Sequence, residues 1–214
     1  MPVDETRYKE ILKKLEPSNT RLIAVSKTKP VDDIQRLYDL GQRDFGENYV
    51  QELIEKAPRL PNDIRWHFIG HLQSNKVKYI TPFVHLIQVV DSFKLLQEIN
   101  KQAIKQNRTI DCLLQMHIAK EETKFGLDEN ELNDLLSQYQ NSSLRNIKVA
   151  GLMGMASFTE DRNAIRNEFH YLKTVFDSHK QFNSLSMGMS SDFEIAVEEG
   201  STMVRIGSLI FGNR

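Results

Sequence analysis

Residues 22–30 read Leu-Ile-Ala-Val-Ser-Lys-Thr-Lys-Pro, an apolar run that stops at a turn containing two lysines. The run Leu22–Val25 is typical of a short buried strand, and Pro30 favours the first turn of a helix. Lys27 therefore follows the carboxyl end of a strand. Partial removal of its amine from water would lower its pKa from about 10.4 and make it available for a Schiff base. Taken alone, the segment is more typical of a solvated lysine at a strand end.

The same order of apolar run, turn and amphipathic stretch recurs along the chain. The predicted strands are Leu22–Val25, Asp44–Gly46, Trp66–Ile69, Leu86–Val90, Cys112–Ile118, Val149–Met153, Ser184–Met187 and Met203–Ile206. The predicted helices are Val31–Leu40, Tyr49–Lys56, Phe93–Gln106, Asp128–Tyr139, Asn163–His179 and Phe193–Glu199, with a short connection at Val77–Tyr79 and an extra amino-terminal helix at Glu5–Leu15.

Alternating strands and helices predict parallel strands joined by right-handed crossovers. Eight such units favour a closed (β/α)8 TIM barrel over an open sheet, which needs only about five or six strands. The chain has 214 residues and is short for this fold, which typically has about 250. We therefore expect one α/β domain spanning residues 1–214.

Composition excludes several classes of protein. The chain has 28 basic and 29 acidic side chains, and this balance predicts no broad surface for nucleic acid or an anionic membrane. Cys112 is the single cysteine, so an intrachain disulfide is impossible. The polar start Met1–Glu5 does not resemble a signal peptide, and no run approaches the ~18 apolar residues that span a bilayer. We expect a cytoplasmic protein.

In a barrel, the loops after the carboxyl ends of the strands form the functional site. This rule gathers Lys27 with the segments after the other predicted strands. Phosphate groups often bind at the loops after strands seven and eight, which here are Ser190–Ser191 and Gly207–Ser208. Ser191 and Glu194 have the spacing of a capping box, whereas Asp192 would repel a phosphate unless it turns away. Tight turns without a ligand remain an alternative for these loops.

Two residues within predicted strands are also candidates. Val204 and Ile206 share one face of the last strand, so Arg205 points to the other face. An inward Arg205 would be a buried charge that requires partners. We expect this orientation in preference to an outward salt bridge, because Gly207, two residues on, would share its side at the rim that faces the phosphate. His67 is more typical of a hydrogen-bonded core histidine than of a metal ligand.

Several long motifs resemble one known family in residues and in order. They are Ala24–Pro30, Phe45–Glu52, His67–Lys76, Gly151–Met153, Leu185–Ser190 and Gly200–Gly207. On these residues the chain is identified as a member of the pyridoxal phosphate homeostasis proteins, the YggS/PROSC family. The resemblance implies a single barrel like the amino-terminal domain of alanine racemase. It also implies a role in vitamin B6 and amino-acid balance, without an established catalytic activity.

The resemblance further implies a pyridoxal 5′-phosphate (PLP) site. Lys27 would hold PLP as a Schiff base, and Arg205 would face its pyridine nitrogen. The remaining implied contacts are Asn48, Ile69 and Gly70 at the ring pocket and Ser190, Gly207 and Ser208 at the phosphate. As partners we expect PLP and PLP-dependent apo-enzymes, and as oligomeric state a monomer.

Two alternatives to a PLP carrier stay open at this point. One is a PLP-dependent racemase of low activity, and the other is a cofactor-free aldolase that uses Lys27 directly. Alanine racemase completes its site with a tyrosine from a second domain, which we do not expect in a chain ending at Arg214. An arginine at the pyridine nitrogen also stays charged and only donates hydrogen bonds, so the ring would be a poor electron sink.

Overall fold

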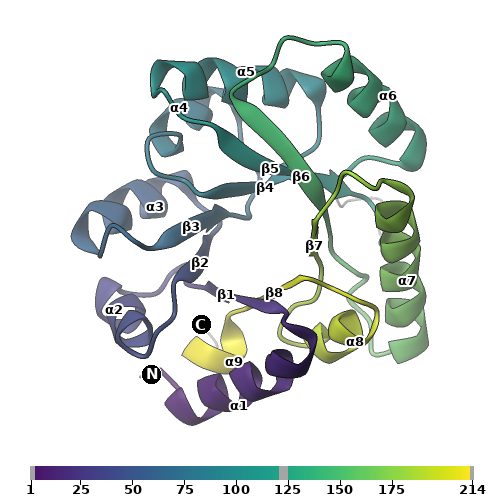
Figure 1. Ribbon diagram of the computed structural model, residues 1–214. Coiled ribbons are helices and arrows are strands. Elements are labelled where there is room, and N and C mark those ends of the chain that lie inside the picture. The colour runs from purple at the N-terminus through teal and green to yellow at the C-terminus, as the bar shows by residue number, and fades with distance from the viewer. Residues whose placement is uncertain (1–2, 121–124, 213–214) are drawn as a thin grey trace.

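The computed structural model describes residues 3–120 and 125–212, and within them eight parallel strands form a closed barrel, as predicted (Figure 1). The strands pair in chain order, and the last pairs with the first. Their bounds are β1 Arg21–Val25, β2 Asp44–Glu47, β3 Arg65–Phe68, β4 Leu86–Val90, β5 Ile110–Met116, β6 Ile147–Gly154, β7 Ser184–Ser186 and β8 Met203–Ile206.

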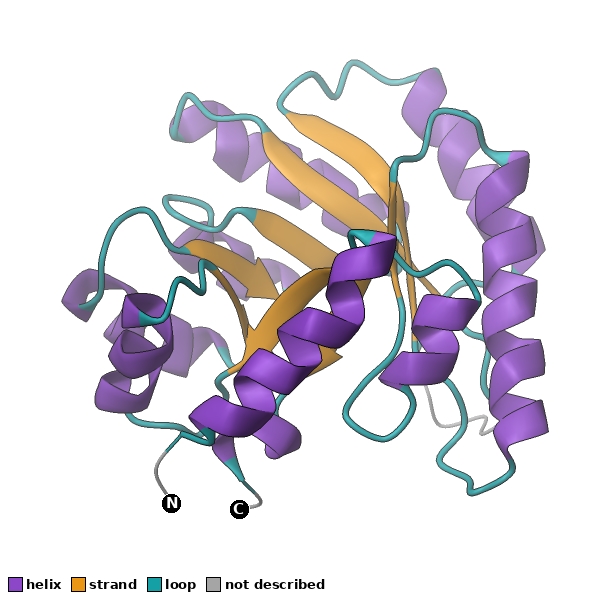
Figure 2. Cartoon of the chain, turned by 60° about the horizontal axis from the view of Figure 1, so that its bottom comes forward, coloured by secondary structure: helices purple, strands orange, loops and turns teal. Residues whose placement is uncertain are grey.

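Helices cover the outside of the barrel (Figures 1 and 2). They are α1 Glu5–Leu15, α2 Val31–Asp39, α3 Val50–Lys56, α4 Val77–Ile80, α5 Phe93–Lys105, α6 Glu129–Gln140, α7 Arg162–Ser178, α8 Phe193–Glu198 and α9 Ser208–Phe211. Single 3-10 turns η1–η3 lie at Glu16–Ser18, Ala57–Arg59 and Ser74–Lys76. Among the residues described, no helix is both long enough and apolar enough to cross a bilayer.

The extra amino-terminal helix is confirmed, and the structure explains its position. The last barrel unit has only the four-residue helix α9, which the sequence analysis did not predict. Helix α1 lies beside α9 and β1 and buries Tyr8, Ile11 and Leu15 (Figure 1). The backbone N–H of Asp4 donates to the carbonyl of Ile210, 2.8 Å away. Helix α1 thus supplies the apolar cover that a short α9 does not provide.

The predicted bounds of β5 and β6 are wrong by about two residues. Both strands begin earlier, at Ile110 and Ile147, because these side chains are buried although polar residues follow them. Strand β5 ends at Met116 because the next N–H group, that of His117, donates to the carbonyl of Leu127. Local hydrophobicity did not reveal that the backbone after Met116 leaves β6 and pairs with Leu127.

Candidate functional site

A cavity of about 420 Å³ opens at the carboxyl ends of the strands. Its lining residues are Val25, Lys27, Asn48, Ile69, Met155, Phe158, Met189, Ser190, Ser191, Arg205, Gly207 and Ser208. Every predicted site residue except Gly70 is in this set. The lining comes from segments after or at the ends of six strands, and the barrel fold brings them together.

Gly70 supports the cavity from behind. A Cβ atom at this position would lie 2.1 Å from the backbone oxygen of Asn48, which is closer than atoms can approach. Gly70 therefore lets the loop after β3 pack directly on the loop after β2. Its effect on a ligand would be indirect, through the position of Asn48.

Lys27 lies in a tight turn that follows β1. The N–H of Lys29 donates to the carbonyl of Ser26, 3.1 Å away, and closes the turn. Ser26 is fully buried, whereas Lys27 is partly exposed and reaches the cavity. Thr28 has the positive φ of 62°, which is unusual for a β-branched residue. Its N–H donates to Oε2 of Glu52 at 2.7 Å, a contact that holds this strained conformation.

A buried ion-pair cluster lies beneath the turn. The Lys56 amine donates to the carbonyl of Ser26 at 2.9 Å, to Oε1 of Glu47 at 2.8 Å and to Oε2 of Glu52 at 2.7 Å. The Ser26 hydroxyl donates to the same Glu47 oxygen at 2.7 Å. Burial raises the pKa of Glu47, and the Lys56 charge opposes that shift. The cluster fixes the backbone on both sides of Lys27.

The second lysine of the turn is bound elsewhere. The Lys29 amine donates to the carbonyls of Phe211 and Gly212, at 2.9 and 3.1 Å, at the carboxyl end of α9. A cation is favourable there because the last carbonyls of a helix lack intrahelical partners. The Lys29 amine thus binds the end of α9, whereas Lys27, two residues earlier, lines the cavity.

The loops after β7 and β8 meet at one end of the cavity. The N–H of Gly207 donates to the Ser190 hydroxyl oxygen at 3.3 Å, and Ser208 begins α9. Oδ1 of Asp192 accepts from the N–H of Met189 at 2.5 Å. One oxygen of the Asp192 carboxylate is thus bound within the loop, and its charge also acts on the buried guanidinium of Arg205.

The predicted capping box of Ser191 and Glu194 is wrong. Helix α8 begins at Phe193, with Asp192 at its N-cap and no side-chain cap bond. Glu194 instead pairs with Lys14 of α1. The spacing was right for a capping box, but the tight loop gives the N-cap position to the next residue.

Arg205 points into the barrel and is 4% exposed. Its Nη1 donates to the Ser186 hydroxyl oxygen at 2.6 Å, and its Nη2 donates to the carbonyl of Gly154 at 3.0 Å. Both acceptors are uncharged. Burial lowers the pKa of Arg205 to about 10, so the guanidinium stays charged at neutral pH.

The polar lining fits a ligand with several acceptor and donor atoms. Oδ1 of Asn48 is buried and has no hydrogen-bond partner among the described residues. An amide can turn to present either its oxygen or its nitrogen, so this group can serve a ligand hydroxyl or phenolate. Together with a lysine amine, a guanidinium and serine hydroxyls, the donor set fits PLP.

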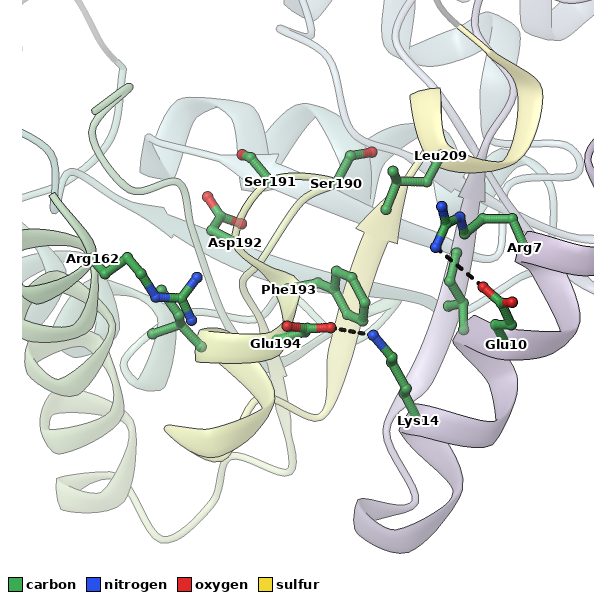
Figure 3. Close-up of a pocket in the computed structure, with 12 residues that line it drawn as sticks. Arg7, Glu10, Lys14, Arg162, Ser190, Ser191, Asp192, Phe193, Glu194 and Leu209 are labelled. Carbon is green, nitrogen blue, oxygen red and sulfur yellow. Dashed lines mark hydrogen bonds and ion pairs between the residues drawn. The ribbon is translucent and has the colours of Figure 1, made fainter. Parts of the chain in front are cut away.

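A second cavity, of about 200 Å³, lies on the outer side of the Ser190 loop between α1 and α8 (Figure 3). Its charged groups largely pair with one another. Arg7 pairs with Glu10 at 3.1 Å, and Lys14 pairs with Glu194. This cavity contains neither Lys27 nor Arg205, so the first cavity is the better candidate for the site.

The sequence analysis missed two parts of the site. Phe158, after β6, is 95% exposed and lines the cavity. Lys56 resembles any lysine in the last turn of a helix, and its contact with Glu47 depends on how α3 packs against β2. Nothing in the local sequence distinguishes either residue.

Comparison with known proteins agrees with this architecture. The family model for the amino-terminal domain of alanine racemase matches residues 5–214. A pyridoxal phosphate homeostasis protein of Aquifex aeolicus is 42% identical over 200 residues, which cover 91% of this chain and 87% of the relative. The human protein of the same name is 41% identical over 211 residues, with 91% and 76% covered. These names describe homeostasis and no catalysed reaction.

Solved structures give the same relationship. The structure of PipY from Synechococcus elongatus, with PLP bound, has a TM-score of 0.88 and 35% identity, covering 97% of this chain and 99% of that chain. Alanine racemase from Bartonella henselae has a TM-score of 0.73 at 16% identity, covering 95% of this chain and 56% of that chain, and shows the fold alone. The chain belongs to the pyridoxal phosphate homeostasis protein family, whose barrel is that of the amino-terminal domain of alanine racemase.

Proposed function

We propose that this protein binds PLP in the 420 Å³ cavity and serves intracellular vitamin B6 homeostasis by holding and releasing it. The observation that carries the proposal is the meeting of the Lys27 turn, the buried Arg205 and the Ser190 loop around one cavity. PLP would supply an aldehyde that reacts with an amine. Family membership and the PLP-bound PipY structure support this choice of ligand.

Each lining residue then has a separate role. The Lys27 amine would condense with the aldehyde and release one water, leaving a Schiff base. Asn48 and Ile69 would contact the ring, with Gly70 supporting them. Arg205 would donate a hydrogen bond to the pyridine nitrogen, because a guanidinium offers donors only.

The phosphate end needs donors, and the loops after β7 and β8 offer them. Ser190 and Ser208 would donate hydroxyl hydrogen bonds, and Ser208 offers its backbone N–H group. Gly207 would orient the Ser190 hydroxyl, because its N–H donates to that oxygen at 3.3 Å. The first N–H groups of a helix lack intrahelical acceptors, which suits the start of α9 for this contact.

The charge of Arg205 favours a carrier over an enzyme. A ring nitrogen that only accepts a hydrogen bond stays unprotonated, and such a ring is a weak electron sink. We propose that the chain acts as a monomer in the cytoplasm and passes PLP to apo-enzymes.

Borohydride reduction followed by peptide mass analysis tests the covalent role. The protein mixed with PLP should be yellow, bleach on reduction and retain the adduct on the peptide containing Lys27. The variant Lys27→Ala should keep its fold and lose the adduct, whereas Lys29→Ala should retain it. An adduct on Lys29 or Lys76 in the native protein would contradict the assignment.

Exchange of an amino acid's α-proton with deuterated water tests the carrier role. We expect negligible exchange by the native protein with either enantiomer. Rapid exchange would replace the carrier with the racemase-like alternative. A colourless protein that binds no PLP would leave the cofactor-free aldolase.

A further inference from the structure

A line of buried polar side chains crosses the otherwise apolar interior of the barrel. Its members come from five strands and are at most 4% exposed: Asp44 of β2, His67 of β3, Gln88 of β4, Ser186 of β7 and Arg205 of β8. Burying a polar group is costly unless it is hydrogen-bonded. Five such groups inside one barrel therefore need an explanation.

The five groups form one continuous chain of hydrogen bonds. Nη1 of Arg205 donates to Oγ of Ser186 at 2.6 Å. Oγ of Ser186 donates to Oε1 of Gln88 at 2.7 Å. Nε2 of Gln88 lies 2.9 Å from Nδ1 of His67. Nε2 of His67 lies 2.9 Å from Oδ1 of Asp44. The series begins at the cavity with Arg205, crosses the barrel interior to β4 and returns to Asp44, the first residue of β2.

The chemistry of the two ends fixes the direction of every bond. A guanidinium can only donate, so the hydroxyl proton of Ser186 must go to the oxygen of Gln88. The Gln88 nitrogen then faces Nδ1 of His67, which must accept. The remaining ring nitrogen carries the proton and donates to Asp44.

The far end of the chain supports this direction. Asp44 also accepts from Nε and Nη2 of Arg65, at 2.8 and 2.5 Å, and therefore stays ionised. Burial lowers the pKa of His67, and the hydrogen bond to Asp44 opposes that shift. A neutral His67 is the form that can both accept from Gln88 and donate to Asp44.

We propose that Ser186, Gln88 and His67 are positioning residues, which fix the direction of the Arg205 guanidinium so that its remaining N–H groups face the cavity. The proposal rests on the proposed function, since the group that Arg205 would meet there is the ring nitrogen of PLP. A carboxylate directly beside Arg205 would compensate its charge at the cavity. The hydrogen-bond acceptors of Arg205, Ser186 and Gly154, are neutral, and the carboxylate at the end of this series of hydrogen bonds, Asp44, is four bonds away. The charge of Asp192 acts on Arg205 from outside the series and opposes the loss of its proton.

The first test of these hydrogen bonds is ¹⁵N NMR on the cofactor-free protein. In the native protein we expect His67 to carry its proton on Nε2 and the Arg205 Nη groups to give separate resonances, because a restrained guanidinium does not rotate freely. Ser186→Ala should merge the Arg205 resonances, and Gln88→Met should shift Nδ1 of His67. Ser201→Ala is the matched control, since Ser201 is a buried serine that bonds to backbone carbonyls of Leu185, Met187 and Met203.

The PLP-bound protein gives the second readout. We expect an altered absorption spectrum and about two- to tenfold faster PLP release in Ser186→Ala and Gln88→Met, the range of one hydrogen bond. Ser201→Ala should match the native protein in both measurements. A structural role alone would lower stability without moving the spectrum.

The outcomes separate this inference from the proposed function. Failure of the native protein to bind PLP would reject the proposed function. The NMR measurements would still show whether the series of hydrogen bonds from Arg205 to Asp44 exists. Normal binding with unchanged spectrum and release in both variants would overturn the inference. A proton on Nδ1 of His67 would also overturn it, and that measurement needs no variant that must fold.

Discussion

Lys56 and Arg205 are both buried cations, but their partners differ in kind. Lys56 contacts two carboxylates, Glu47 and Glu52, within 2.8 Å. Arg205 donates to a hydroxyl and to a backbone carbonyl, and the series of hydrogen bonds that starts at Arg205 ends at the carboxylate of Asp44. The Lys56 charge is compensated inside the protein and holds the Lys27 turn in place. The Arg205 guanidinium has neutral hydrogen-bond acceptors and is also under the influence of the Asp192 charge. We propose that its remaining N–H groups meet a ligand.

The largest effect that this comparison predicts is on stability at Lys56. Lys56→Met should cost about 3–5 kcal/mol of unfolding free energy, because Glu47 would stay buried without a cation. Chemical denaturation would measure the loss. Lys101→Met is the control, since Lys101 is 64% exposed and lies 3.7 Å from Glu98, and it should change stability by less than about 0.5 kcal/mol.

The cost at Lys56 should also depend on pH. Burial raises the pKa of Glu47 above its unfolded value. Such a carboxyl favours the folded state below its unfolded pKa, and this contribution is lost as the pH rises through the folded pKa. The penalty of Lys56→Met should therefore shrink on acidification. A penalty independent of pH would show that the cost lies in packing and not in charge.

The next largest effect concerns the distant carboxylate of the Arg205 chain. Burial acts to raise the pKa of Asp44, but hydrogen bonds from Arg65 and His67 outweigh it and hold that pKa well below its usual range. The stabilisation is present above the unfolded pKa of about 3.9 and is lost as the pH falls toward the folded pKa. Asp44→Asn should lose about 2 kcal/mol near neutral pH and flatten the acid limb of the stability curve.

Denaturation at several pH values would measure this effect. Asp177→Asn is the control, because Asp177 is 54% exposed and pairs with Lys173 on the surface of α7. If the unfolding free energy of Asp44→Asn falls with acidification as steeply as that of the native protein, Asp44 does not hold the end of the Arg205 hydrogen-bond series.

A smaller effect is expected at the phosphate end, where Ser190 offers a neutral donor in place of a cation. Ser190→Ala should weaken PLP retention by about 1–2 kcal/mol, roughly tenfold. It should leave binding of pyridoxal, which lacks the phosphate, unchanged. Equilibrium dialysis of both ligands would test this. An equal loss for the two ligands would show that Ser190 does not contact the phosphate.

The smallest effect is expected from removing the second cation. Arg205→Met should change the stability of the cofactor-free protein by about 1 kcal/mol, because its hydrogen-bond acceptors are neutral and the cost of burying a charge disappears. The lost attraction to Asp192 acts in the opposite direction. Thermal unfolding of Arg205→Met and Lys56→Met under the same conditions compares the two losses of stability directly. A loss as large as that of Lys56→Met would abolish the distinction between the two cations.

Much of this molecule was predictable because the signals are local. Short apolar runs marked most of the strands, and helical spacing marked most helices. The barrel rule then placed Lys27, Asn48 and Ser190 at one rim, where the structure has them. Alternation along β8 separated Arg205 from Val204 and Ile206, and the position of Gly207 favoured the inward direction, which the structure confirms.

The amino-acid sequence by itself determined most of the order of elements, the closed barrel and most of the residues at its mouth. Tertiary structure alone decided the partners of the buried charges. Lys56 meets Glu47 because α3 folds back on β2, and Gln88 meets Ser186 although 98 residues separate them. Periodicity reports which face of a strand a side chain occupies. It carries no information on which strand lies opposite across the barrel.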